Sequence, residues 1–124
     1  MSTTLDGVIV YEILPNGCLN GVFSNDHPDN VNHEMFNEIA KKVSNIDNNG
    51  GDEIFGNYIC SYIDFGNEVE ICDLVIKPGH KRQNGRRCQY DFIWQDKITK
   101  KIKFEGSGWR TRANQITVSY RDVV

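Results

Sequence analysis

The chain has 124 residues, a formal net charge of −3 at pH 7 and 39% hydrophobic residues. This length predicts one domain over residues 1–124, and the apolar content excludes a chain that is disordered by composition. No stretch is long and apolar enough for a membrane-spanning helix, and no signal peptide is recognisable. We therefore expect a cytoplasmic protein with no membrane contact.

Charge is distributed unevenly along the chain. Residues 1–53 carry nine acidic and two basic side chains, whereas residues 54–124 carry eight acidic and twelve basic ones. Such asymmetry is typical of two differently charged surfaces that attract each other or a partner. Because the protein is acidic overall, we do not expect nucleic acid to be its partner.

The four cysteines, Cys18, Cys60, Cys72 and Cys88, form no Cys-x-x-Cys pair and lie within strand patterns. In a reducing compartment such residues act as small buried hydrophobes. We predict four free thiols, with a disulfide or a catalytic thiol as the alternative.

The first part of the chain predicts a hairpin followed by a helix. Residues 8–14 form an apolar run, residues 15–17 (Pro-Asn-Gly) are a turn signal, and residues 18–24 are the returning strand. A polar loop follows. Apolar residues then recur at the i, i+3, i+4 and i+7 positions of one helix face, which predicts a short amphipathic helix near residues 33–43; they are Phe36, Ile39, Ala40 and Val43.

From residue 54 onward the pattern predicts one short strand after another. Residues 54–64 and 69–77 form a hairpin, and residues 88–94 alternate between large apolar and other side chains. Glycines at positions 106 and 108 predict a bulge or bend. The chain then turns near residues 113–114 and ends in a β-branched strand.

Seven or eight consecutive strands joined by tight turns favour an antiparallel up-and-down meander, which avoids exposed edges by closing on itself. The fold expected is therefore mainly β, a barrel of about eight strands with one short helix. Its strand number, its meander order and the Gly-Ser-Gly-Trp of residues 106–109 before the final strand resemble the calycin group of lipocalin-, avidin- and fatty-acid-binding-like barrels. That resemblance implies an apolar ligand held in the lumen.

Aromatic residues provide the first candidate site. On their strands, Tyr58 and Tyr62 share one face, and so do Tyr90, Phe92 and Trp94. If both sets point inward, they line an apolar lumen with polar tips, as ligand pockets do. The alternative is that the rings fill a solid core, because an eight-stranded barrel is only just wide enough for side chains.

The second candidate site concerns Trp109, Arg110 and Arg112. Without a register shift, both arginines point inward and form a fork for a carboxylate or phosphate. A one-residue bulge at Gly106 to Gly108 reverses this facing. We predict the bulge, with Trp109 inward as part of the lumen and both arginines outward.

Loops provide the remaining candidates. The basic loop contains His80, Lys81, Arg82, Arg86 and Arg87, which suit an anionic partner; a solvated hairpin loop is the alternative. Residues 45–52 imitate a calcium loop, but its twelfth position is Gly56 where a glutamate is needed, so we predict no metal. Residues 26–33 are expected to form a surface loop, with a metal or acid–base cluster of Asp26, His27, Asp29 and His33 as the alternative.

No catalytic motif or phosphate-cradling loop is present, so we expect no cofactor. The main hypothesis is non-enzymatic binding of a small, largely apolar ligand in the barrel lumen. The alternatives are a protein–protein interaction or regulatory module with a solid core, and a small enzyme at the barrel mouth. The sequence names neither the ligand, the partner nor the oligomeric state.

Overall fold

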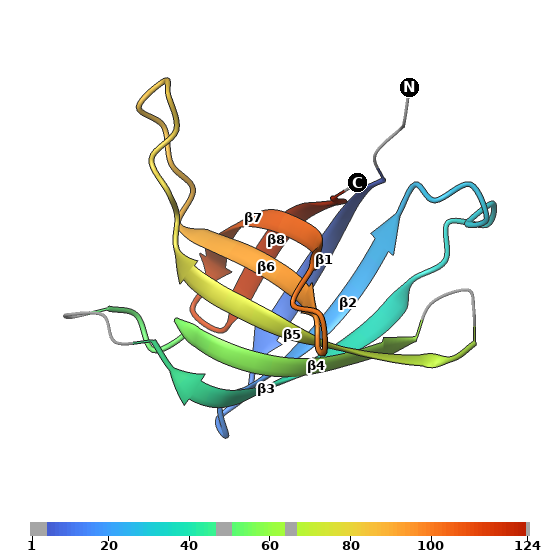
Figure 1. Ribbon diagram of the computed structural model, residues 1–124, viewed down its shortest axis with the longest axis horizontal. Helices are drawn as coiled ribbons and strands as arrows, with labels where there is room; N and C mark the ends of the chain where they lie inside the picture. The colour runs from blue at the N-terminus through green and yellow to red at the C-terminus, as the bar shows by residue number, and fades with distance from the viewer. Residues whose placement is uncertain (1–4, 47–50, 64–66, 124) are drawn as a thin grey trace.

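A computed structural model describes residues 5–46, 51–63 and 67–123. The chain forms a closed barrel of eight antiparallel strands, each bonded to the next in chain order (Figure 1). The strands are β1 Asp6–Ile13, β2 Cys18–Asn25, β3 Phe36–Asn45, β4 Gly56–Ile63, β5 Val69–Pro78, β6 Tyr90–Asp96, β7 Ile102–Arg112 and β8 Gln115–Asp122. This confirms the predicted antiparallel meander that closes into a barrel.

The first and last strands complete the barrel by pairing with each other. The register places Asp6 opposite Arg121 and Tyr11 opposite Ile116, so the start of β1 and the end of β8 lie at the same end of the barrel (Figure 1). The predicted turns lie where expected, between β1 and β2 and between β7 and β8. In the first turn Gly17 adopts a φ of 83°, a conformation that glycine takes at little cost.

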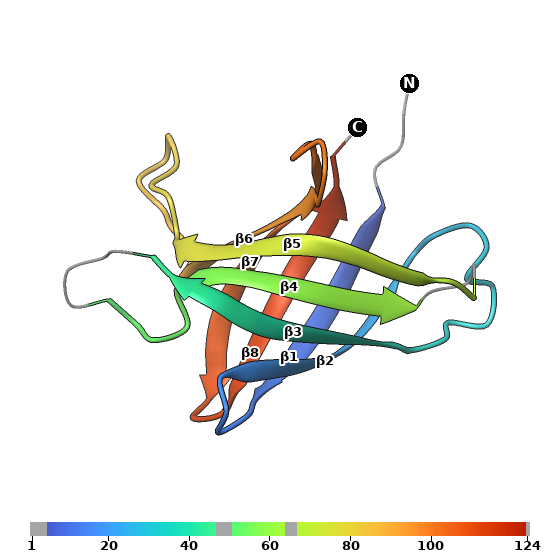
Figure 2. The ribbon, with the colours of Figure 1, turned by 60° about the horizontal axis from the view of Figure 1, so that its bottom comes forward.

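The predicted helix near residues 33–43 is wrong, since residues 36–45 form β3 and the described residues contain no helix. Phe36, Glu38 and Ala40 point inward, whereas Ile39 and Val43 of the supposed helix stripe are about half exposed. Hydrogen bonding to β2 and β4 determines the structure of this segment. An acidic residue at an inward position conceals the two-residue period on which strand recognition depends. Figure 2 shows β3 lying between its neighbours along one side of the barrel.

Large side chains fill the end of the barrel where β4 and β6 begin. Tyr11, Tyr58, Tyr90 and Phe92 are fully buried there. The ring of Tyr11 stacks on Phe92 with centroids 5.7 Å apart, and Tyr90 meets Phe92 edge-on at 6.5 Å. Packing of this density is typical of small barrels whose interior is a core.

The predicted bulge at Gly106 to Gly108 is wrong, because both residues keep an unbroken register with β8. The glycines instead provide space for large neighbours. A Cβ atom on Gly108 would lie 2.8 Å from the Phe92 ring, and one on Gly106 would lie 2.8 Å from Val118. Gly106 and Gly108 therefore let bulky side chains approach the backbone of β7 inside the barrel.

The four cysteines are free thiols in this structure. Cys60 and Cys72 face each other across β4 and β5 with their sulfurs 3.0 Å apart. The hydrogen bond with Cys72, together with burial, raises the pKa of the Cys60 thiol. Burial likewise raises the pKa of Cys88, which donates to the Tyr90 carbonyl.

We expect iodoacetamide to modify Cys18 first in the folded protein, because Cys18 is partly exposed and the other three are buried. The thiolate is the reactive form, and burial disfavours it. After denaturation without reductant, mass spectrometry should find four modified cysteines. Recovery of an unmodified Cys60–Cys72 pair would contradict the prediction of four thiols.

The described residues also contain no helix long and apolar enough to cross a membrane. The cytoplasmic location stays a prediction.

Candidate ligand-binding site

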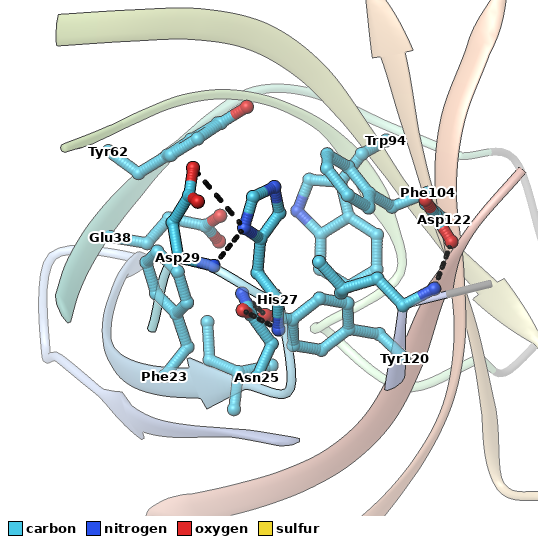
Figure 3. A pocket seen from close by; sticks show the side chains of 12 residues that line it. Phe23, Asn25, His27, Asp29, Glu38, Tyr62, Trp94, Phe104, Tyr120 and Asp122 are labelled. Atoms are coloured by element: carbon cyan, nitrogen blue, oxygen red, sulfur yellow. Dashed lines mark hydrogen bonds and ion pairs between the residues drawn. The ribbon is translucent and has the colours of Figure 1, made fainter. Parts of the chain in front are cut away.

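A cavity of about 430 Å³ lies at the end of the barrel where β1 begins and β8 ends (Figure 3). Its volume lies within the range of small-molecule sites. Nearly every strand and the segment after β2 contribute to its lining, which consists of Leu5, Ile9, Phe23, Asn25, His27, Asp29, Glu38, Tyr62, Trp94, Phe104, Tyr120 and Asp122.

Five of the twelve residues that line the cavity are aromatic. Each ring comes from an inward position of a different strand, because side chains alternate between the two faces of a strand. Phe23 meets Tyr62 edge-on at 6.0 Å, and Phe104 meets both Trp94 and Tyr120 edge-on, at 6.5 and 6.0 Å. Edge-to-face contacts of this kind hold the rings against one another and give the cavity a defined shape.

Glu38 of β3 is the buried acid of the cavity, with 5% of its surface exposed. The hydroxyl of Tyr11 donates a hydrogen bond to its Oε2 atom. Burial raises the pKa of Glu38 to about 7, although the neighbouring Tyr11 and Trp94 donors act in the opposite direction. The carboxyl group therefore changes charge near neutral pH.

The indole N–H of Trp94 points into the same region. It lies close enough to Glu38 to lower the pKa of that carboxyl group, yet Nε1 is buried and makes no hydrogen bond of ordinary geometry. Buried polar groups are rarely left unpaired in folded proteins. Glu38 and Trp94 thus mark the part of the cavity where a polar group of a ligand is best accommodated.

The segment after β2 forms the mouth of the cavity. Asn25 accepts a hydrogen bond from the His27 backbone at 3.1 Å and donates one to the Tyr120 hydroxyl at 3.0 Å. His27 Nδ1 accepts from the Asp29 backbone at 3.0 Å and lies 3.8 Å from the Asp29 carboxylate. The Asp29 side chain is 76% exposed, so the cavity reaches solvent here.

The predicted aromatic residues divide between the two ends of the barrel. Tyr58 and Tyr90 belong to the filled end, where their hydroxyls donate to the Ile54 carbonyl at 2.7 Å and to Asp52 at 2.5 Å. Phe92 also belongs to the filled end and packs against Trp94, and Tyr62 and Trp94 line the cavity. The solid core considered from the sequence therefore describes the end where β4 and β6 begin, and the open lumen describes the end where β1 begins and β8 ends.

The predicted facing of Trp109 and Arg110 is wrong. Trp109 lies on the outside of the barrel with 47% of its surface exposed, because the glycines do not shift the register. Arg110 is half buried and its Nη2 atom lies 3.2 Å from Asp52. This ion pair covers the filled end, far from the cavity lining. Arg112 is exposed, as predicted.

The basic loop projects from the barrel between β5 and β6 (Figure 1). His80 Nδ1 lies 2.7 Å from the Asp91 carboxylate, and Arg82 donates to Ser107 at 2.7 Å, which fixes the base of the loop. Lys81, Arg86 and Arg87 are exposed. Recognition of an anionic partner by this loop stays a prediction.

Metal ligands are the last kind of site considered from the sequence. The four residues 47–50 of the calcium-like segment lie outside the described residues. Within the part of the chain that is described, no three His, Cys, Asp or Glu side chains are grouped so that they could hold a metal ion.

Comparison with known proteins gives no relative: no family model, no curated protein and no solved structure matches the chain. The eight-stranded closed barrel agrees with a calycin-like strand pattern, and no family residue is available to locate a site. The geometry of the cavity itself therefore carries the functional argument.

Sequence reasoning missed several residues of the cavity. Glu38 was concealed by the helix prediction, and a strand reading would have placed it between the inward Phe36 and Ala40. His27 and Asp29 were considered only as parts of a surface loop or of a metal or acid–base cluster, not as lining of a ligand cavity. The other aromatic residues that were missed are Phe23, Phe104 and Tyr120, which the alternation of their strands places inward.

Proposed function

We propose that the protein binds a small, largely apolar ligand in the cavity at the β1 and β8 end of the barrel. The single observation that carries the proposal is an aromatic cavity of about 430 Å³ that contains a buried carboxyl group. Apolar walls with a few placed polar groups are the usual construction of ligand sites, since the walls supply affinity and the polar groups fix orientation.

Two features of the lining support binding over catalysis. The described lining residues include no serine, threonine, cysteine or lysine nucleophile. The imidazole of His27 is engaged by Asp29 at the mouth of the cavity. A serine, threonine, cysteine or lysine nucleophile depends on an adjacent base or a lowered pKa, and the described lining residues provide none of these four nucleophiles.

The proposal predicts that an apolar dye quenches Trp94 in the cavity. We expect N-phenyl-1-naphthylamine, a neutral fluorophore, to quench protein fluorescence at micromolar concentration in the Trp109→Phe variant, whose only tryptophan is Trp94. The Trp94→Phe variant keeps only the outer Trp109 and should show little quenching. Equal quenching of both variants, or quenching of neither, would contradict binding in the cavity.

A further inference from the structure

The lining of the cavity is acidic as well as aromatic. Glu38, Asp29 and Asp122 contribute carboxyl groups, and the described lining residues include no lysine or arginine. Lys103 lies beside the ring wall without being part of the lining: its Nζ atom is 6.0 Å from the centre of the Tyr62 ring and 3.5 Å from the Tyr62 hydroxyl. An anionic ligand would therefore meet three carboxyl groups in the lining, and no lysine or arginine there would offset them.

Glu38 and Trp94, labelled in Figure 3, are buried members of this lining. Tyr11 donates to only one carboxyl oxygen of Glu38, and the nearby Trp94 N–H makes no hydrogen bond of ordinary geometry to that carboxyl group. Burying a carboxylate is costly unless it is paired. A positively charged N–H donor from a ligand would pair the carboxylate directly.

The aromatic wall adds a second reason to expect a cation. Phe23, Tyr62, Phe104 and Tyr120 surround the same space as Glu38 and Trp94. The faces of such rings attract an ammonium group within about 6 Å, and the attraction grows when water is excluded. A carboxylate inside an aromatic wall is thus suited to an ammonium group carried on an apolar body.

We infer that the ligand is a small organic cation, an amine whose ammonium group pairs with Glu38 while its apolar body contacts the aromatic wall. This inference rests on the proposed function and adds the charge and chemical class of the ligand. Asp29, exposed at the mouth, supplies additional negative potential along the path of entry.

Three naphthyl compounds that share an apolar body test the inference. They are 2-(1-naphthyl)ethylamine, which is cationic at pH 8, the neutral 2-(1-naphthyl)ethanol, and the anionic 1-naphthylacetate. Isothermal titration calorimetry at pH 8 should find the amine bound roughly tenfold to a hundredfold more tightly than the alcohol, as expected for one charge-assisted hydrogen bond. The acid should bind most weakly.

Variants locate the preference for a cation. Glu38→Gln should weaken binding of the amine by about tenfold or more. The affinity for the alcohol should be largely unaffected. Glu12→Gln removes the same charge from an exposed position on β1 and should change neither affinity. Circular dichroism establishes that each variant is folded, and the comparison of amine with alcohol in the unmodified protein does not depend on any variant.

The outcomes separate the two proposals. If the alcohol binds and the amine binds no better, or if the acid binds best, the cation inference is wrong and the ligand site stands. If none of the three binds and the neutral dye also fails to quench Trp94, both proposals are wrong. Equal loss of amine affinity in Glu38→Gln and Glu12→Gln would remove Glu38 as the counter-ion.

Discussion

Replacing Tyr58 by alanine should destabilise the protein by roughly 3–5 kcal/mol, the range found when a large buried aromatic side chain is truncated. Tyr58 is 1% exposed, and its hydroxyl donates to the Ile54 carbonyl at 2.7 Å. The substitution leaves a hole in the filled end and removes that hydrogen bond. Urea unfolding measures the loss, and dye binding to the remaining folded protein should be close to normal.

Tyr62 provides the matched comparison on the same strand and the same inward face. It is half buried and borders the cavity, so its truncation extends an existing space and creates no new hole. We expect Tyr62→Ala to lower the free energy of unfolding by only about 1 kcal/mol. It should weaken dye binding by about tenfold, which corresponds to about 1.4 kcal/mol of binding free energy.

Tyr58→Ala should mainly lower stability, whereas Tyr62→Ala should mainly lower dye affinity. A strong loss of stability in Tyr62→Ala, without any dye binding in the unmodified protein, would mean that this end is also a solid core. The ligand-binding proposal would then fail. The interaction hypothesis would remain, and it would direct attention to the exposed Lys81, Arg86 and Arg87 of the basic loop.

Local sequence patterns were sufficient for the order of the strands and for much of the interior. The turn at residues 15–17 and the alternation of Tyr90, Phe92 and Trp94 both predict what the structure contains, because turn chemistry and two-residue periodicity are local properties. The position of the last hairpin follows from the same rules.

The errors arose where long-range packing decides between two local alternatives. Phe36, Ile39, Ala40 and Val43 fit a helix in isolation, and only pairing with β2 and β4 selects the strand. Gly108 was taken as a bend, whereas its role depends on the Phe92 ring, a neighbour that the local pattern does not identify. The cavity was still harder to predict from local patterns, because its wall is formed by residues from several strands and exists only once the barrel has closed.

Glu38→Gln should change how stability depends on pH. Burial raises the pKa of Glu38 from 4.5 to about 7, so the folded protein binds more protons than the unfolded chain between these two values. The free energy of unfolding then falls as pH rises through this window and stays low above it. At 1.36 kcal/mol per pKa unit, this one group accounts for about 3 kcal/mol between pH 4 and pH 8.

The variant isolates this contribution because the other titratable groups are retained. Tyr11 and Cys60 lie close to Glu38 in the core. Their titrations occur in both proteins, so to first order they cancel when the two stability profiles are subtracted. Urea unfolding at several pH values should show Glu38→Gln gaining up to about 3 kcal/mol over the unmodified protein as pH rises from 4 to 8.

The neutral amide retains an acceptor for the Tyr11 hydroxyl, so the gain should appear without loss of that hydrogen bond. Glu12→Gln serves as the control, because Glu12 is exposed and its removal should leave the pH profile unchanged. If Glu38→Gln and the unmodified protein lose stability in parallel as pH rises, Glu38 is not a buried acid with a raised pKa. An amine that binds at Glu38 should reduce the loss of stability that the unmodified protein shows as pH rises. It pairs with the ionised carboxylate of Glu38 and stabilises the folded protein by mass action.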